Sequence, residues 1–149
     1  MNRRTLLAVP LLALIAQRAE AAPTSVAHVW SRAALAGRVG VVYLTIKGGD
    51  AGDTLLSAST PVAPKAELHE SYEENGVMKM RPIASLPVAA GKMVMLKPGG
   101  YHIMLVGLTK ALTPGETFPL TLDFAKAGDI TVTVQVEKAG ASGMPGMKM

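Results

Sequence analysis

The chain has 149 residues, enough for one domain with a packed core. It has no cysteine, which excludes disulfides and catalytic thiols. Basic residues exceed acidic ones by 15 to 11, but without the first 21 residues the balance is 12 to 10. This near-neutral balance gives no reason to expect a nucleic acid as partner.

The first 21 residues have the pattern of an export signal. Arg3 and Arg4 precede an apolar segment, residues 6–16, and Ala19-Glu20-Ala21 matches a small-x-small cleavage site. The apolar segment is too short for a permanent membrane span. We therefore expect a periplasmic protein cleaved after Ala21, exported by the general secretory or the twin-arginine route. Without a cysteine at the cleavage point, no membrane anchor is expected.

Eight or nine short strands are expected after the signal. Alternating apolar residues are clearest in FPLTLDF, residues 118–124, and ITVTVQV, residues 130–136, which the turn KAGD joins as a hairpin. Gly, Pro and Asn separate the other candidates, and no long segment has a helical period. These candidates are residues 26–30, 40–46, 54–58, 66–70, 77–81, 92–96 and 102–108. The pattern predicts an all-β sandwich or barrel over residues 22–138. The Gly- and Met-rich residues 139–149 are expected to form a flexible tail.

Two of the three histidines occur beside methionines. His69 opens the segment HESYEENGVMKM, which closes with Met78 and Met80, and His102 stands two residues before Met104. Residues i and i+2 of a strand point to the same face. Each histidine therefore belongs to a segment that also offers thioether sulfur.

A hairpin would bring these segments together. If residues 66–70 pair with residues 77–81 as a hairpin with a long loop, His69 comes near Met80. A strand over residues 102–108, lying alongside or across from the hairpin, would then add His102 and Met104 at one end of the sandwich.

Two imidazoles and two thioethers form a soft, neutral donor set. Soft sulfur donors select Cu(I), whereas a blue-copper electron-transfer centre needs a cysteine thiolate and is excluded here. An ordinary structural role stays open, because methionine often fills cores and a buried histidine often only donates or accepts hydrogen bonds. Met78, Met93 and Met95 could likewise be packing residues or a rim around the site.

The spacing of these residues resembles a family signature. His69, ten residues, Met80, twenty-one residues, His102, one residue and Met104 form an H-x10-M-x21-H-x-M pattern. It is similar to the signature of the periplasmic copper chaperones of the PCu(A)C family. The segments LHESYEENGVMKMRPI, LKPGGYHIMLVGL and VWSRAALAGRVGVVYLTIKGG resemble that family too, and the resemblance covers about residues 25–137.

The resemblance implies a cupredoxin-like Greek-key β fold. It implies one Cu(I) bound by His69, Met80, His102 and Met104. It also implies delivery of copper toward the binuclear centre of cytochrome c oxidase, through the copper-bearing subunit, a Sco-type thiol protein, or both. We expect the chain to act as a monomer.

Two features depart from the family. His28 stands where an acidic residue is common, and we expect it to be a surface histidine. The chain ends in Met144, Met147 and Met149, which could add secondary copper contacts or form an inert end.

Three functions remain open: a copper chaperone, a copper-sequestering or storage protein for copper tolerance, and an interaction module that docks a protein through its Met-rich face without metal. An enzyme is not expected, because no Ser-His-Asp arrangement or catalytic carboxylate pair is evident.

Overall fold

The computed structural model describes residues 21–143, which form ten β-strands and no helix. Residues 1–20 of the expected export signal, and Met144, Met147 and Met149 of the expected tail, lie outside the described residues. The strands are β1 (Ser25–Arg32), β2 (Gly40–Lys47), β3 (Asp53–Ser59), β4 (Lys65–Glu74), β5 (Val77–Pro82), β6 (Leu86–Val88), β7 (Met93–Leu96), β8 (Tyr101–Val106), β9 (Thr117–Phe124) and β10 (Gly128–Glu137). Residues 21–143 hold no helix with the length and apolar character needed to cross a membrane. The expected all-β class is confirmed.

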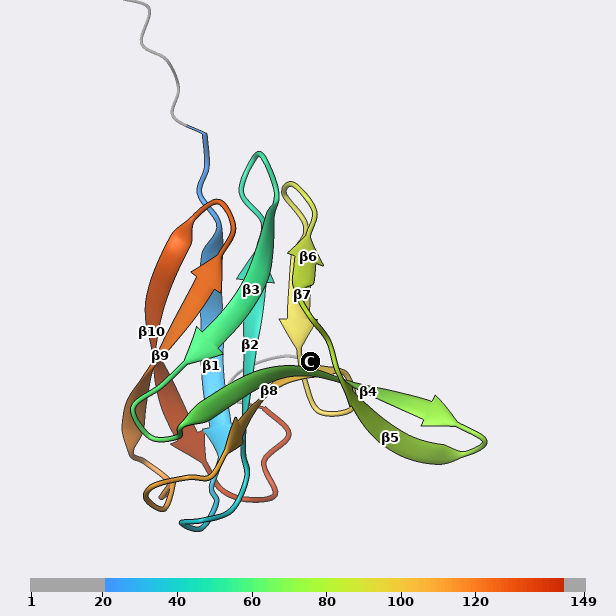
Figure 1. Ribbon diagram of the computed structural model, residues 1–149. Helices are drawn as coiled ribbons and strands as arrows, with labels where there is room; N and C mark the ends of the chain where they lie inside the picture. The colour runs from blue at the N-terminus through green and yellow to red at the C-terminus, as the bar shows by residue number, and fades with distance from the viewer. Residues whose placement is uncertain (1–20, 144–149) are drawn as a thin grey trace, which may run out of the picture.

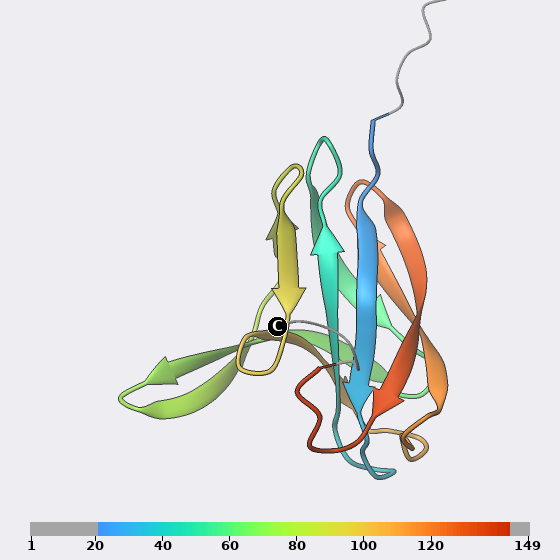
Figure 2. The ribbon, with the colours of Figure 1, turned by 180° about the vertical axis from the view of Figure 1, so that it is seen from behind.

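The strands form one mixed sheet that folds into two layers. Its order is β5-β4-β8-β2-β1-β10-β9-β3-β6, and β7 pairs with the part of β2 beyond β8. The β1–β10 pair is parallel and the other pairs are antiparallel. Figure 1 shows β3 and β9 nearest the viewer, whereas β1, β2 and β7 are nearest in the reverse view of Figure 2.

Alternating side chains fill the space between the layers. In β9, Phe118, Leu120, Leu122 and Phe124 are buried, as the sequence pattern predicted. On the facing layer, Val42 pairs with Ile103 and both belong to the core cluster. Because strand residues alternate between faces, their neighbours point to the opposite side. We call this side of β5, β4, β8, β2 and β7 the outer face.

One strand was not expected from the sequence. The three-residue strand β6 pairs with β3 and places Pro87 opposite Thr54. Proline within a short apolar segment argues against a strand, because it cannot donate a ladder hydrogen bond. Here β6 is an edge strand, where this loss is tolerated, and Leu86 and Val88 are buried on either side of Pro87.

The hairpin of β4 and β5 projects from the body of the molecule (Figures 1 and 2). The expected pairing is confirmed, but the expected long loop is wrong, because β4 continues through Glu73 and Glu74. The turn consists of Asn75 and Gly76, with φ angles of 52° and 78°. Asn-Gly suits a two-residue hairpin turn, which needs positive φ at both positions. The charged residues obscured the strand in the sequence; they are tolerated because the projecting tip is exposed.

Candidate metal centre

The strand register brings the four predicted ligands to the outer face. His69 lies opposite His102 in the β4–β8 pair, and Met104 lies opposite Glu67. In the β4–β5 pair, Met80 lies opposite Ser71, two residues from His69. Directly opposed residues of an antiparallel pair share a face, and diagonal neighbours stay within reach of long side chains. The four residues therefore share one sheet face, rather than meeting at an end of the sandwich.

The two imidazoles lie side by side. Their ring centroids are 5.7 Å apart, with an angle of 36° between the ring planes. His102 is 3% exposed, and the side chain of His69 is 12% exposed. The register thus places two poorly hydrated imidazoles in direct proximity.

Each ring has one nitrogen held by an oxygen acceptor. Nε2 of His69 lies 2.9 Å from Oε2 of Glu67, and Nδ1 of His102 lies 3.2 Å from the carbonyl oxygen of Gly100. A carboxylate and a carbonyl only accept hydrogen bonds, so in neutral rings these two nitrogens carry the hydrogen. The lone pairs are then on Nδ1 of His69 and Nε2 of His102.

Both lone-pair nitrogens are buried and unsatisfied. Within the described chain, neither Nδ1 of His69 nor Nε2 of His102 has a hydrogen-bond partner. Buried polar atoms are normally bonded, and exceptions need an explanation. Metal-bound histidines commonly show this arrangement, with the other ring nitrogen hydrogen-bonded to a carboxylate or carbonyl.

The environment keeps His102 neutral. Burial lowers the pKa of His102 below its ordinary value of 6.5, the Gly100 carbonyl raises it in part, and the proximity of His69 lowers it further. A neutral imidazole is the form that binds metals.

Met80 reaches the same space as His102. Both line a cavity of about 310 Å³ on the outer face. Arg32 and Tyr43 also line this cavity, with the Arg32 guanidinium carbon 5.7 Å from the centroid of the Tyr43 ring. Burial raises the pKa of Tyr43 and nearby Arg32 lowers it in part, so the phenol stays neutral near pH 7.

Glu67 was missed as a candidate. Its carboxylate holds His69, and it lies opposite Met104. Glu67 and His69 are i and i+2 on one strand, so the rule that paired His102 with Met104 could have found it. Within residues 21–143, no three His, Cys, Asp or Glu side chains gather as a metal-binding group. The outer face instead offers thioethers next to its two imidazoles.

All five methionines of residues 21–143 lie on the outer face. Met93 and Met95 lie opposite Lys47 and Thr45 of β2, while Met78 lies opposite Glu73 of β4. Met78, Met93 and Met95 are exposed, so the interpretation that they fill the core is wrong. Of these three, only Met78 lines the cavity that His102 also lines.

The remaining expectations concern the two ends of the domain. His28 is exposed, as expected, and has a φ of 53° at a register shift in β1. Near the other end, Arg32 Nε donates a hydrogen bond of 2.8 Å to the carbonyl oxygen of Ala141. This bond fixes the last described residues beside the cavity that Arg32 lines.

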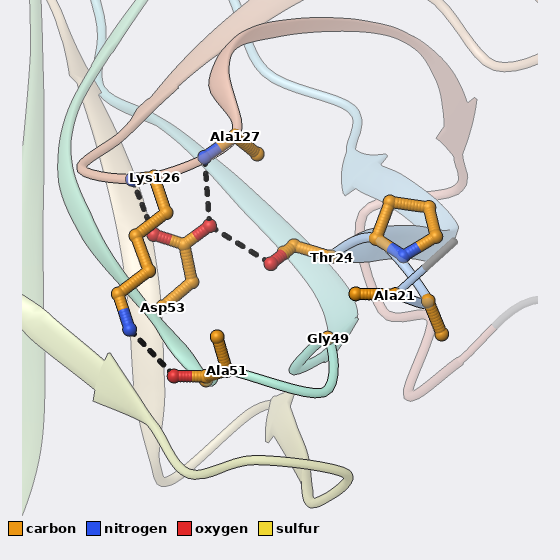
Figure 3. A pocket seen from close by; sticks show the side chains of 10 residues that line it. Ala21, Thr24, Gly49, Ala51, Asp53, Lys126 and Ala127 are labelled. Carbon is orange, nitrogen blue, oxygen red and sulfur yellow. Dashed lines mark hydrogen bonds between the residues drawn. The ribbon is translucent and has the colours of Figure 1, made fainter. Parts of the chain in front are cut away.

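A second cavity, of about 260 Å³, is lined by Asp53 and by residues near the start of the described chain (Figure 3). The Asp53 carboxylate accepts hydrogen bonds from the Thr24 hydroxyl at 2.8 Å and from the backbone nitrogens of Thr54, Lys126 and Ala127 at 2.8, 2.8 and 3.0 Å. These four donors use the capacity of both oxygens. Asp53 therefore ties the start of β1 to β3 and to the β9–β10 turn, and is not a site for a ligand.

Known proteins are similar to this chain in sequence and in fold. The family model described as "Putative lipoprotein LpqE-like" matches residues 24–136. A "Putative lipoprotein" of Leifsonia xyli subsp. xyli is 31% identical over 113 residues, which is 75% of this chain and 68% of the relative. The chain belongs to the LpqE-like family.

Solved structures with a similar fold include two copper-bound proteins. The copper-bound PCuAC domain from PmoF2 has a TM-score of 0.65 and 23% identity, over 80% of this chain and 97% of that domain. Cu(I)-bound DR1885 from Deinococcus radiodurans has a TM-score of 0.54 and 27% identity, over 82% and 81%. The PCu(A)C resemblance and the cupredoxin-like fold expected from the sequence are confirmed. The metal-binding role of the four residues stays a prediction.

Proposed function

We propose that this chain is an exported, periplasmic copper chaperone. It binds one Cu(I) through His69, Met80, His102 and Met104 and delivers it for assembly of the binuclear copper centre of cytochrome c oxidase. The recipient is the copper-bearing subunit of the oxidase or a Sco-type thiol protein. The chain acts as a monomer and catalyses no reaction.

One observation carries the proposal: two neighbouring imidazoles each keep a buried lone-pair nitrogen that has no hydrogen-bond partner among the described residues. An unsatisfied buried polar group destabilises a fold by about 1–3 kcal/mol. Two such nitrogens on adjacent strands, each with its other ring nitrogen held, are accounted for by a metal ion between them.

The donor chemistry favours Cu(I). All four donors are neutral, and two are thioethers, which suit a soft monovalent cation better than Zn(II) or a hard divalent ion. The copper-bound PCuAC domain from PmoF2 and Cu(I)-bound DR1885, which have this fold, support this choice.

Exposure of one ligand favours delivery over storage. Met80 is 58% exposed, on an edge strand of the sheet. A partner can therefore contact one Cu(I) ligand while the histidines still hold the ion. A storage site would gain from burial of all four donors.

A Cu(I) titration against a competing chelator tests the site. The unaltered chain should bind one Cu(I), while Met80→Leu and Met104→Leu should each bind at least about tenfold more weakly. Leucine matches methionine in volume, so the fold should survive. The matched control is Met93→Leu, an exposed methionine of the same face, which should bind as the unaltered chain does. Full affinity in the Met80→Leu, Met104→Leu double variant would refute the ligand assignment.

Delivery needs a separate test in cells. Deletion of the gene should reduce the copper content of cytochrome c oxidase at low external copper, and the unaltered gene should restore it. If deletion instead leaves oxidase copper unchanged and reduces growth at high copper, the chain has a sequestering role.

A further inference from the structure

The cavity beside His102 contains a methionine outside the proposed ligand set. Met78 lines it together with Met80, and both project from β5 on the outer face. Met78 lies opposite Glu73, two residues closer to the Asn75-Gly76 turn than Met80. Met78 therefore lies farther toward the exposed tip of the hairpin.

The three cavity donors differ in exposure. Met78 is 56% exposed, Met80 is 58% exposed, and His102 is 3% exposed, with its free nitrogen buried. An ion from solvent can thus reach either thioether before it reaches the imidazole. Met78 is an additional soft donor within the entrance to the site.

Thioether exchange suits the movement of Cu(I). Methionine is flexible, polarizable and neutral, so one thioether can replace another without a change in charge. Thioethers do not bind protons in the physiological range, so the exchange also releases none. Moving the ion along a row of methionines therefore avoids the protonation steps that thiolate ligands require.

We propose that Met78 is a transient Cu(I) ligand through which copper enters and leaves the site. On entry, a Cu–S bond to Met78 forms and then breaks as a bond to His102 Nε2 forms, with copper remaining Cu(I) throughout. Release to a partner follows the reverse order. This inference rests on the proposed function and adds an exchange route to the four ligands.

The other exposed methionines provide an internal control. Met93 lies on the same outer face and is 64% exposed, but it is on β7 and does not line this cavity. If any exposed thioether could speed Cu(I) exchange, Met93 would contribute as much as Met78. If position beside the cavity decides, Met78 alone would contribute.

The experiment compares equilibrium with kinetics in the unaltered chain, Met78→Leu and Met93→Leu. Competition with a Cu(I) chelator measures affinity, and stopped-flow transfer to and from the chelator measures the two rates. A transient ligand changes the barrier and not the end states, so Met78→Leu should slow both rates by the same factor, at least about fivefold. Its affinity should stay within about twofold, and Met93→Leu should change neither quantity.

The outcomes separate this inference from the proposed function. Unchanged rates in Met78→Leu, with normal Cu(I) binding by the unaltered chain, would overturn the exchange route alone. A tenfold loss of affinity in Met78→Leu would overturn the transient role, because Met78 would then be an equilibrium ligand. Equal slowing by Met93→Leu would overturn the positional argument. Failure of the unaltered chain to bind Cu(I) would overturn the proposed function and the route with it.

Discussion

Two buried polar side chains, Asp53 and His102, differ in how completely their hydrogen-bonding capacity is used. Both oxygens of Asp53 are occupied by four donors from three separate segments. His102 has one nitrogen held by a carbonyl and one nitrogen without a partner among the described residues. A satisfied buried group stabilises the fold, whereas an unsatisfied one reduces stability unless a ligand completes it. The contrast separates a structural element from a candidate binding site.

The largest expected difference is in copper affinity. His102→Leu removes a proposed ligand and should weaken Cu(I) binding by more than about 100-fold, because loss of an outer-shell partner alone typically costs 10–100-fold. Asp53→Asn should leave affinity within about twofold. A chelator competition titration measures both. Copper binding by His102→Leu at full strength would remove the distinction between the two residues.

Asp53 should contribute more to the stability of the fold than His102 does. Asp53→Ala leaves several donors without their charged acceptor, and hydrogen bonds to charged groups are worth about 1.5–3 kcal/mol each. We expect the free energy of unfolding of the copper-free protein to fall by about 2–3 kcal/mol in urea denaturation. A change below about 0.5 kcal/mol would show that these hydrogen bonds do not hold the segments together.

The two residues should also affect stability in different pH ranges. The folded state has a lowered pKa at His102, mainly because of burial. At Asp53, burial raises the pKa, but the hydrogen bonds together lower it below 3.8. In both cases the unfolded chain takes up a proton first as pH falls, so stability decreases with acidification.

For His102 this loss begins near pH 6.5, and for Asp53 it begins near pH 3.8. As the pH falls, the unfolding free energy of the copper-free protein should therefore decline over two separate pH ranges. His102→Leu should flatten the upper range only, and Asp53→Asn should flatten the lower range only. If His102→Leu leaves the upper range unchanged, another group is responsible for it.

The smallest expected effect is the change in stability caused by His102→Leu, which is opposite in sign to that of Asp53→Ala. At pH 7, His102→Leu should stabilise the copper-free protein by about 1 kcal/mol, because it removes an unsatisfied buried nitrogen. The carbonyl of Gly100 keeps a partner, since it also accepts a hydrogen bond from the Ser71 nitrogen at 3.0 Å. Urea denaturation checks the sign. A clear loss of stability would mean that His102 supports the fold.

Much of the fold could be predicted from alternation in the sequence. Residues 118–124 and 130–136 follow a strict pattern because one side of each strand packs against the core. The short strand β6 could not, because it has three residues with Pro87 at the centre. The true length of β4 was hidden by Glu73 and Glu74, which the projecting hairpin leaves in solvent.

The candidate site was predictable in composition but not in geometry. The i, i+2 rule placed His102 with Met104, and the Met-rich segments identified His69 and Met80. The opposition of His69 and His102 depends on how β8 pairs with β4, which a single sequence does not show. The carbonyl of Gly100 was also beyond prediction, because its direction depends on the turn before β8.

The hairpin also explains why ten residues separate His69 from Met80. With Asn75 and Gly76 as the turn, His69 lies opposite Pro82, and Met80 lies two residue pairs closer to the turn than His69. Inserting one residue into either strand would rotate Met80 to the opposite face. Inserting two would restore the face but displace the thioether by about 7 Å along the strand. The hairpin register thus sets the position of Met80 relative to His69. Substitutions in it can tune the site, whereas insertions and deletions change which donors meet.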